Sequence, residues 1–300
     1  MTKIRSSSSS RVQDRRGQGG GGGGFGFPGL GGGGGGLGIP MKAGGGILGL
    51  VVVLAAILLP KLLGGGSQGF TGADDPSLTP SAAEGPTQCT TEIEQIVCGG
   101  VDDVAEYWIV QYPESWGESY RDTGTRWFSG ATSTGCGDAS AQMGPFYCPA
   151  DEYVYFDLDF LTQLQQQFGA TGDLAAQYIV AHEYGHHVQN VLGVSSEVSR
   201  LQQQNPGLAN QYSVALELQA DCFAGAWARN ADERGLLEQG EISEALTAAA
   251  AVGDDRIQEQ AGMTVDQDSF THGTSEQRVQ WFRRGYDTGD PTRCSTFEEL

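Results

Sequence analysis

The sequence predicts the α+β fold class: a mainly helical domain with a small β-sheet, preceded by one transmembrane helix. Three observations support this. Apolar residues recur at helical spacing over much of the chain, one short stretch alternates aromatic with other residues, and an uncharged apolar run precedes both. Because composition changes sharply along the 300 residues, we divide the chain into four parts. These are a disordered tail (1–42), a transmembrane anchor (43–63), a linker (64–88) and a folded domain (89–300).

The tail is basic and rich in serine and glycine. Residues 1–46 hold six basic residues and one acidic residue, so they carry a charge of +5, and the rest of the chain carries −25 to give the total of −20. A segment with so little apolar surface does not offset the entropy lost on ordering, so we expect it to be disordered. The acidic balance of the domain argues against nucleic acid as a partner.

An apolar run over 47–59 contains no charged residue. Extended to neighbouring residues, it reaches about 17 residues, the shorter end of a membrane span. A signal-peptide core is the competing interpretation, but no Ala-x-Ala-like site follows closely, and we favour an uncleaved anchor. Basic residues before the run place the N-terminus in the cytoplasm and the domain outside, as a single-pass membrane protein.

Six cysteines follow the apolar run, as expected in an oxidising compartment. Fifteen pairings are open to six cysteines. Proximity in sequence favours Cys89 with Cys98 and Cys136 with Cys148, which leaves Cys222 with Cys294.

Several stretches of the domain carry the patterns of regular structure. Residues 91–112 have helical spacing, interrupted by Gly99-Gly100. The alternation over 151–159 predicts a strand of a hairpin, with Tyr155 as a candidate cleft residue. Residues 241–260 predict another helix, and Thr274 with Gln277 predicts the capped start of the last one.

The central motif is His-Glu-x-x-His within a predicted helix that starts at an N-cap Asp173 and stops at Gly193. Four residues of helix turn about 400°, so His182 and His186 lie on one face and are placed to bind one zinc ion. Glu183 then lies beside the open side of the metal, as a general base would. His187 points about 100° away from His186 and is not expected to be a ligand.

A second predicted helix, over 213–227, supplies the remaining ligand. Glu217 and Asp221 are four residues apart on one face of an otherwise apolar helix, where unpaired carboxylates are costly to bury. We assign Glu217 as the third zinc ligand. Asp221 is expected to accept the free ring N–H of a ligand histidine.

Four motifs together resemble the bacterial neutral zinc metallopeptidase family and, more widely, the gluzincins. The similarity covers about residues 89–285. The motifs are His-Glu-Tyr-Gly-His-His-Val-Gln-Asn at 182–190, Glu-Leu-Gln-Ala-Asp-Cys-Phe-Ala-Gly at 217–225, Gly-Pro-Phe-Tyr-Cys-Pro-Ala-Asp at 144–151 and Ser-Phe-Thr-His-Gly-Thr-Ser-Glu-Gln-Arg at 269–278.

The resemblance implies a zincin-like domain that uses Zn²⁺ and has a sheet over the active-site helix. Its edge strand would hold an extended peptide. The last motif would face the active site, where His272 or Arg278 could stabilise an oxyanion. The substrate would be a peptide or protein, cleaved by an endopeptidase rather than an exopeptidase.

We therefore expect a membrane-anchored, extracytoplasmic zinc metallopeptidase in which Glu183 activates the attacking water. One alternative is a catalytically inactive, zinc-stabilised scaffold of the cell envelope, against which the intact Glu183 argues. A di-iron carboxylate bundle needs a second Glu-x-x-His helix, which the sequence lacks. The sequence does not indicate an oligomeric state.

Overall fold

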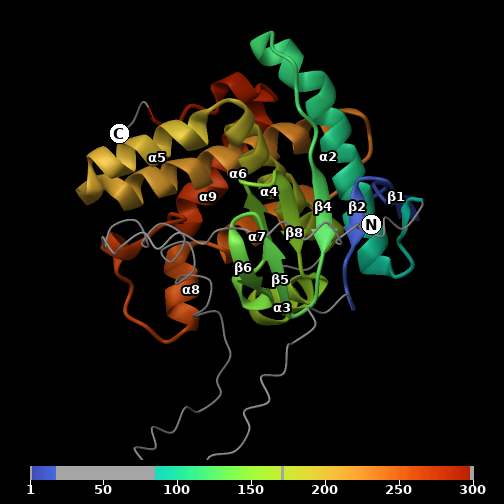
Figure 1. Ribbon diagram of the computed structural model, residues 1–300, viewed down its shortest axis with the longest axis horizontal. Helices are drawn as coiled ribbons and strands as arrows, with labels where there is room; N and C mark the ends of the chain where they lie inside the picture. The colour runs from blue at the N-terminus through green and yellow to red at the C-terminus, as the bar shows by residue number, and fades with distance from the viewer. Residues whose placement is uncertain (1, 18–84, 170–171, 298–300) are drawn as a thin grey trace, which may run out of the picture.

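Helix α4 (Asp173–Val191), which carries the two candidate histidine ligands, is packed between other elements of the domain. The computed structural model describes residues 2–17, 85–169 and 172–297. Helices α2 (Glu92–Trp116), α6 (Ala209–Glu233) and α7 (Glu241–Ala251) all contact α4 (Figure 1). Helix α9 (Ser275–Thr288) in turn packs on α6 and α7. The prediction of a mainly helical α+β domain is confirmed.

The ends of α4 differ by one residue from the prediction. Gly172 is the N-cap, with φ 111°, and Asp173 is the first helical residue, so the predicted N-cap at Asp173 is wrong. At the other end Leu192 is the C-cap, and Gly193 follows with φ 78° in the left-handed region. Glycine tolerates this conformation without steric cost, which explains why the helix stops there as predicted.

Two other helices depart from the predicted pattern. Helix α2 runs through Gly99 and Gly100 without the expected interruption, starting at a capping box of Thr91 and Glu94. The single helix predicted over 241–260 is instead α7 followed by α8 (Asp254–Gln260). The break falls at Gly253, where an added Cβ would lie 2.4 Å from the backbone nitrogen of Ser275, so α9 approaches too closely for a larger residue.

Helices α6 and α9 are in backbone contact. A Cβ at Gly225 would lie 2.0 Å from the carbonyl oxygen of Phe282, and one at Gly285 would lie 1.9 Å from that of Cys222. These two glycines allow α9 to lie against the helix that carries Glu217. Other helical segments of the described residues are α3 (Leu158–Phe168), α5 (Val194–Gln204), η2 (Ala141–Met143), η3 (Pro206–Leu208), η4 (Gln267–Ser269) and η5 (Pro291–Arg293).

A four-stranded sheet lies beside α4, in the order β2 (Val12–Asp14), β4 (Gly124–Trp127), β8 (Tyr153–Phe156) and β7 (Phe146–Cys148). The first three strands are parallel, and the edge strand β7 is antiparallel to β8, which confirms the predicted hairpin. Two smaller pairs are β5 (Ala131–Thr134) with β6 (Gly137–Ser140) and β1 (Ser8–Ser9) with β3 (Thr87–Gln88).

Residues 2–17, which we call the arm, are ordered on the domain, so the expected disorder of the tail is wrong for them. They provide β1 and β2, and Ile4 and Val12 are buried in the main core. The charges that suggested a solvated tail are paired instead, as in the ion pair of Arg5 with Asp173. Residues 18–42 of the predicted tail lie outside the described residues.

Within the described residues, every helix is too short or too polar to span a bilayer. The predicted transmembrane helix at 43–63, and the predicted linker up to residue 84, lie outside that part of the chain.

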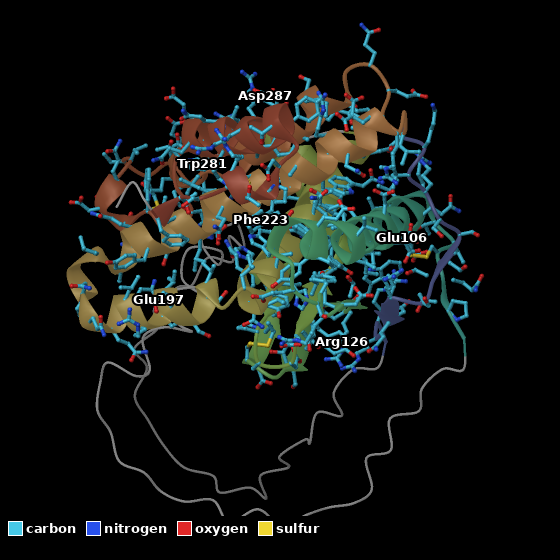
Figure 2. All side chains as sticks on the ribbon, turned by 90° about the horizontal axis from the view of Figure 1, so that it is seen from above. Glu106, Arg126, Glu197, Phe223, Trp281 and Asp287 are labelled. Atoms are coloured by element: carbon cyan, nitrogen blue, oxygen red, sulfur yellow. A yellow bond between two sulfur atoms is a disulfide. The ribbon has the colours of Figure 1, made fainter. Side chains whose placement is uncertain are left out.

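The three predicted disulfide pairs are confirmed. Cys89–Cys98 closes the start of α2, Cys136–Cys148 ties the β5–β6 hairpin to β7, and Cys222–Cys294 ties α6 to the C-terminal segment (yellow bonds in Figure 2).

Removing the Cys222–Cys294 bond should destabilise the domain more than removing Cys89–Cys98. The paired residues are 72 and 9 positions apart in the sequence. Chain entropy then gives losses of about 4 and about 2.5 kcal/mol. All four cysteines are buried, so double alanine variants of the two pairs are matched controls for each other. Denaturant unfolding measures the difference, and equal losses would contradict the loop-length argument.

Candidate metal centre

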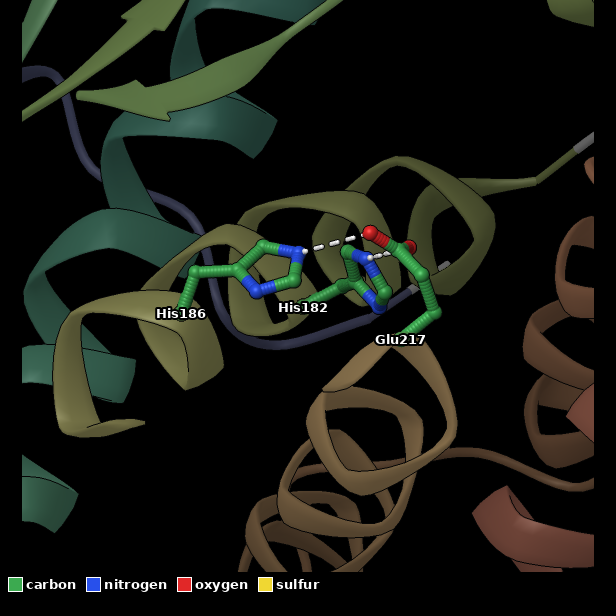
Figure 3. A group of neighbouring side chains, drawn as sticks. All are labelled: His182, His186 and Glu217. Atoms are coloured by element: carbon green, nitrogen blue, oxygen red, sulfur yellow. Dashed lines mark hydrogen bonds and ion pairs between the residues drawn. The ribbon is translucent and has the colours of Figure 1, made fainter. Parts of the chain in front are cut away.

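His182 and His186 on α4 converge with Glu217 on α6 (Figure 3). One ligand atom from each lies within 4.8 Å of the others. His182 Nε2 is 3.2 Å from Glu217 Oε2, and His186 Nε2 is 3.5 Å from Glu217 Oε1. The structure thus brings together the three residues assigned as ligands from the sequence. Two imidazoles and one carboxylate form a donor set found in catalytic zinc sites, which keep a fourth position for water or substrate.

The charges in this group attract one another strongly. Burial favours the neutral form of His182, but the Asp221 and Glu217 carboxylates outweigh it and raise its pKa to about 9. Burial also opposes ionisation of Glu217, yet the surrounding histidines hold the pKa of this carboxyl well below its usual range. A divalent cation that binds here must displace protons from the imidazoles, so its affinity should fall as the pH falls.

Asp221 lies directly behind His182. Its Oδ1 is 2.9 Å from His182 Nδ1 and also accepts from Tyr178 Oη at 2.5 Å. Arg278 donates from Nε to Asp221 Oδ2 at 2.8 Å. With Nδ1–H donated to Asp221, His182 presents Nε2 as the metal-binding nitrogen. This is the position predicted for Asp221.

Gln189 has the same relation to His186, and the sequence did not predict this contact. Its Oε1 is 2.8 Å from His186 Nδ1, and its Nε2 donates to the Leu216 carbonyl and to Gln219 Oε1. The amide oxygen therefore accepts Nδ1–H and leaves Nε2 of His186 free for a metal. The available signal was spacing, because Gln189 is three residues after His186 and lies on the same helical face.

Glu183 is buried beside the two histidines. All three side chains line one cavity, which is described below. Burial raises the pKa of its carboxyl above the usual range, against the opposing effect of the nearby histidines. A carboxylate in this environment binds a proton more readily than one in water. Glu183 is thus suited to the general-base role assigned to it.

His272 also lines the cavity, on the loop before α9, and is buried. Its Nδ1 is 3.0 Å from Asp254 Oδ1, while Asp254 Oδ2 accepts the backbone N–H groups of residues 271–273. Asp254 therefore fixes both the loop and the ring, leaving Nε2 for a group in the cavity. No local pattern identified Asp254, which lies 18 residues before His272.

Two other candidates have structural contacts. Arg278 is held by Asp221 and by the Val252 carbonyl, which restrains it at the back of the site. Tyr155 is buried in a separate cluster with Phe128, and its hydroxyl contacts Asp151 and Arg126. Tyr155 does not line the cavity, so its assignment as a cleft residue is wrong.

His187 is buried away from the ligand group and anchors the edge strand. Its Nε2 is 2.6 Å from the Arg121 carbonyl oxygen, and its Nδ1 is 2.9 Å from Tyr147 Oη on β7. Burial lowers the pKa of His187, so the neutral ring donates to Arg121 and accepts from Tyr147. Asn190 also donates to Tyr147 Oη. The residues following the His-Glu-x-x-His motif therefore tie α4 to β7.

The cavity beside the ligand group has a volume of about 310 Å³. Its walls come from β7 and the turn before it, from α4, and from α5 and α6. Apolar side chains on these elements include Phe146, Ile179, Val198 and Leu216. The edge strand and the metal ligands thus face one cleft.

Comparison with known proteins agrees with this geometry and extends the similarity to the arm. The family model described as "Putative neutral zinc metallopeptidase" matches residues 1–297, more than the 89–285 inferred from motifs. The uncharacterized protein YpfJ of Escherichia coli K12 is 42% identical over 264 residues, 84% of this chain and 86% of that protein. The uncharacterized protein Rv2575 of Mycobacterium tuberculosis H37Rv is 51% identical over 183 residues, 57% and 61% of the two chains. No solved structure matches.

Measurements of zinc affinity should distinguish the roles of Glu217 and Asp221, the two carboxylates on α6. Glu217→Gln replaces an anionic ligand with a weak neutral one and should abolish stoichiometric zinc binding. Asp221→Asn should lower zinc affinity by about 10–100-fold, as expected when the partner of a ligand histidine is lost. Titration against a competing chelator measures both, and Glu233→Gln on the exposed part of α6 is the control. Full zinc retention in Glu217→Gln, with loss in Asp221→Asn, would reverse the assignment.

Proposed function

Because this chain belongs to the neutral zinc metallopeptidase family, we propose that it hydrolyses peptide bonds at the His182–His186–Glu217 centre. The observation that carries the proposal is the convergence of these three side chains beside the buried Glu183. A purely structural zinc site is closed by four protein ligands, whereas the part of the chain that the structure describes supplies three here, beside a cavity.

In the proposed mechanism the protein supplies the proton transfers. Zinc bound at this centre would polarise the substrate carbonyl and lower the pKa of a water molecule. Glu183 takes the proton of the attacking water and later donates it to the leaving amine. The raised pKa of Glu183 suits both steps, because the carboxyl must hold the proton between them.

The same proposal gives His272 the role of stabilising the oxyanion that forms at the carbonyl. The contact of its Nδ1 with Asp254 would orient the ring toward the cavity. Arg278 instead acts on the ligand group through Asp221.

The edge strand β7 supports an extended peptide as the substrate. Its other side is paired with β8, and its residues Phe146 and Tyr147 line the cavity. A peptide can pair with such an edge through backbone hydrogen bonds. This favours an endopeptidase over an exopeptidase.

We place the domain outside the cytoplasm, on the same side as the arm that packs on it, and we propose the apolar segment 43–63 as its attachment to the membrane. The three disulfides support this location, because such bonds persist mainly in oxidising compartments.

The proposed activity is tested with the full-length protein and an unstructured protein such as casein, with and without a chelator. Cleavage should require zinc. Glu183→Gln should bind zinc stoichiometrically but cleave at least about 10²-fold more slowly, because the isosteric amide cannot accept the proton. Zinc binding without any cleavage by the wild type would favour the scaffold alternative. Unchanged cleavage by Glu183→Gln would exclude the proposed base.

His272→Ala should lower kcat by about 10²-fold or more with zinc content unchanged, because oxyanion stabilisation acts mainly in the transition state. Asp254→Asn should lower kcat less, since the ring of His272 is retained but its orientation is less well supported. Asp255→Asn is the matched control, because Asp255 contacts Ser275 rather than His272. Normal turnover in His272→Ala would reduce this residue to a packing role.

A further inference from the structure

The arm packs against α2 around Gly99, against the first turns of α4 and against β4, and we call these contacted surfaces together the arm groove. Gly99 is in the interior of α2, where glycine is less favourable than alanine. A Cβ there would lie 2.6 Å from Arg5 Cα and 2.6 Å from the Ile4 carbonyl oxygen. The helix therefore carries a glycine at the point where the backbone of the arm crosses it.

Main-chain hydrogen bonds hold the arm along its length. Ser6 N–H donates to the Gln95 carbonyl at 3.0 Å, and Arg15 N–H donates to that of Trp127 at 2.9 Å. Between them β2 pairs with β4 in parallel, with Val12 opposite Thr125. The arm thus completes one edge of the sheet whose other edge faces the cleft.

The cations of the arm meet carboxylates of the domain. Arg5 is 2.7 Å from Asp173, Arg11 is 3.1 Å from Asp122, and Arg16 is 2.7 Å from Glu94. Burial opposes ionisation of Glu94, but hydrogen bonds from Thr91, Arg16 and Thr90 outweigh it and lower its pKa to about 2. The basic arm and the acidic domain are therefore complementary in charge at several separate points.

Two residues of the helix that carries the metal ligands, Asp173 and Gln177, contact the arm. Asp173, the first residue of α4, binds Arg5 and accepts the backbone N–H of Thr2. Gln177, which is fully buried one turn further on, donates to the Ile4 carbonyl at 2.6 Å and to that of Ile96 at 3.1 Å. The start of α4 is thus held between the arm and α2.

We propose that the arm groove is a binding site for the chain's own basic N-terminal segment, which docks there in the folded protein and fixes the start of the metal-binding helix. The arm groove favours an extended backbone, because β2 of the arm pairs with β4. Gly99 allows the backbone of the arm to approach α2 closely, and carboxylates of the domain pair with the arginines of the arm. The family model includes residues 2–17, which agrees with an integral role for the arm. The proposal does not depend on peptidase activity.

Docking also restricts how the chain meets a membrane. The arm ends at Gly17 and the described chain resumes at Gly85, and these two parts touch where Thr87 Oγ1 donates to the Val12 carbonyl at 2.6 Å. A single crossing between them would put the arm and the domain on opposite sides. The docked arm therefore places the N-terminus on the same side of the membrane as the metal centre.

Hydrogen exchange of the full-length protein tests docking directly. The amides of Ser6 and Arg15 should exchange at least about 100-fold more slowly than in an unstructured chain. Gly99→Ala should remove this protection and lower Tm, because its Cβ meets the arm backbone. Glu106→Ala, at an exposed position of the same helix (labelled in Figure 2), should leave protection intact. Unprotected arm amides in the wild type, or a raised Tm in Gly99→Ala, would overturn the proposal.

An N-terminal epitope tag tests the membrane consequence separately. In intact cells that make the full-length protein, an impermeant protease should reach the tag and the domain together, or neither of them before lysis. Either result supports docking, and the second would contradict only the proposed extracytoplasmic location. A tag protected until lysis while the domain is digested from outside would overturn docking, whatever the catalytic activity.

Discussion

The buried carboxylate of Asp221 is the interaction on which the arrangement of the site depends. It has no exposed surface, and its charge is balanced by Arg278 from α9 and by hydrogen bonds from His182 and Tyr178 on α4. Removing one partner of such a buried ion pair costs about 3–5 kcal/mol, because the remaining charge stays without compensation. Three helices must therefore keep their relative positions. Glycines in α4, α6 and α9 bring the backbones close enough for these short contacts.

The residues that could be predicted are those whose relation is set by one helix. Helical geometry alone places His182 and His186 on one face, and the same holds for Glu217 and Asp221. Placing the histidine pair next to the carboxylate pair required only the assumption that both helices face the same metal ion. The disulfides could also be predicted from local information. Two pairs of cysteines are close in the sequence, and pairing them leaves Cys222 and Cys294 for the third bond.

The remaining site residues depend on contacts between distant parts of the chain. Asp254 reaches His272 through a break between α7 and α8 that periodicity did not indicate. The alternation in β8 predicts two faces, but it does not show that β8 is an inner strand of the sheet. The edge strand β7 lines the cavity instead, and Tyr155 packs in the separate cluster with Phe128. The arm was expected to be disordered because its composition was judged without the residues that it contacts in the fold. Its carboxylate partners lie about 80 to 170 residues away.

Seen along α4, these distant contacts restrain the metal-binding helix at both ends. The arm and α2 hold Asp173 and Gln177 at its start, while Tyr147 on the edge strand holds His187 and Asn190 near its end. The two histidine ligands lie between these anchors. A catalytic group works best when its supporting contacts fix it close to the productive geometry. The sheet contributes to both restraints, because its edge strand β2 belongs to the arm and its other edge strand β7 lines the cleft. A shift of either edge strand would therefore change the positions of His182 and His186.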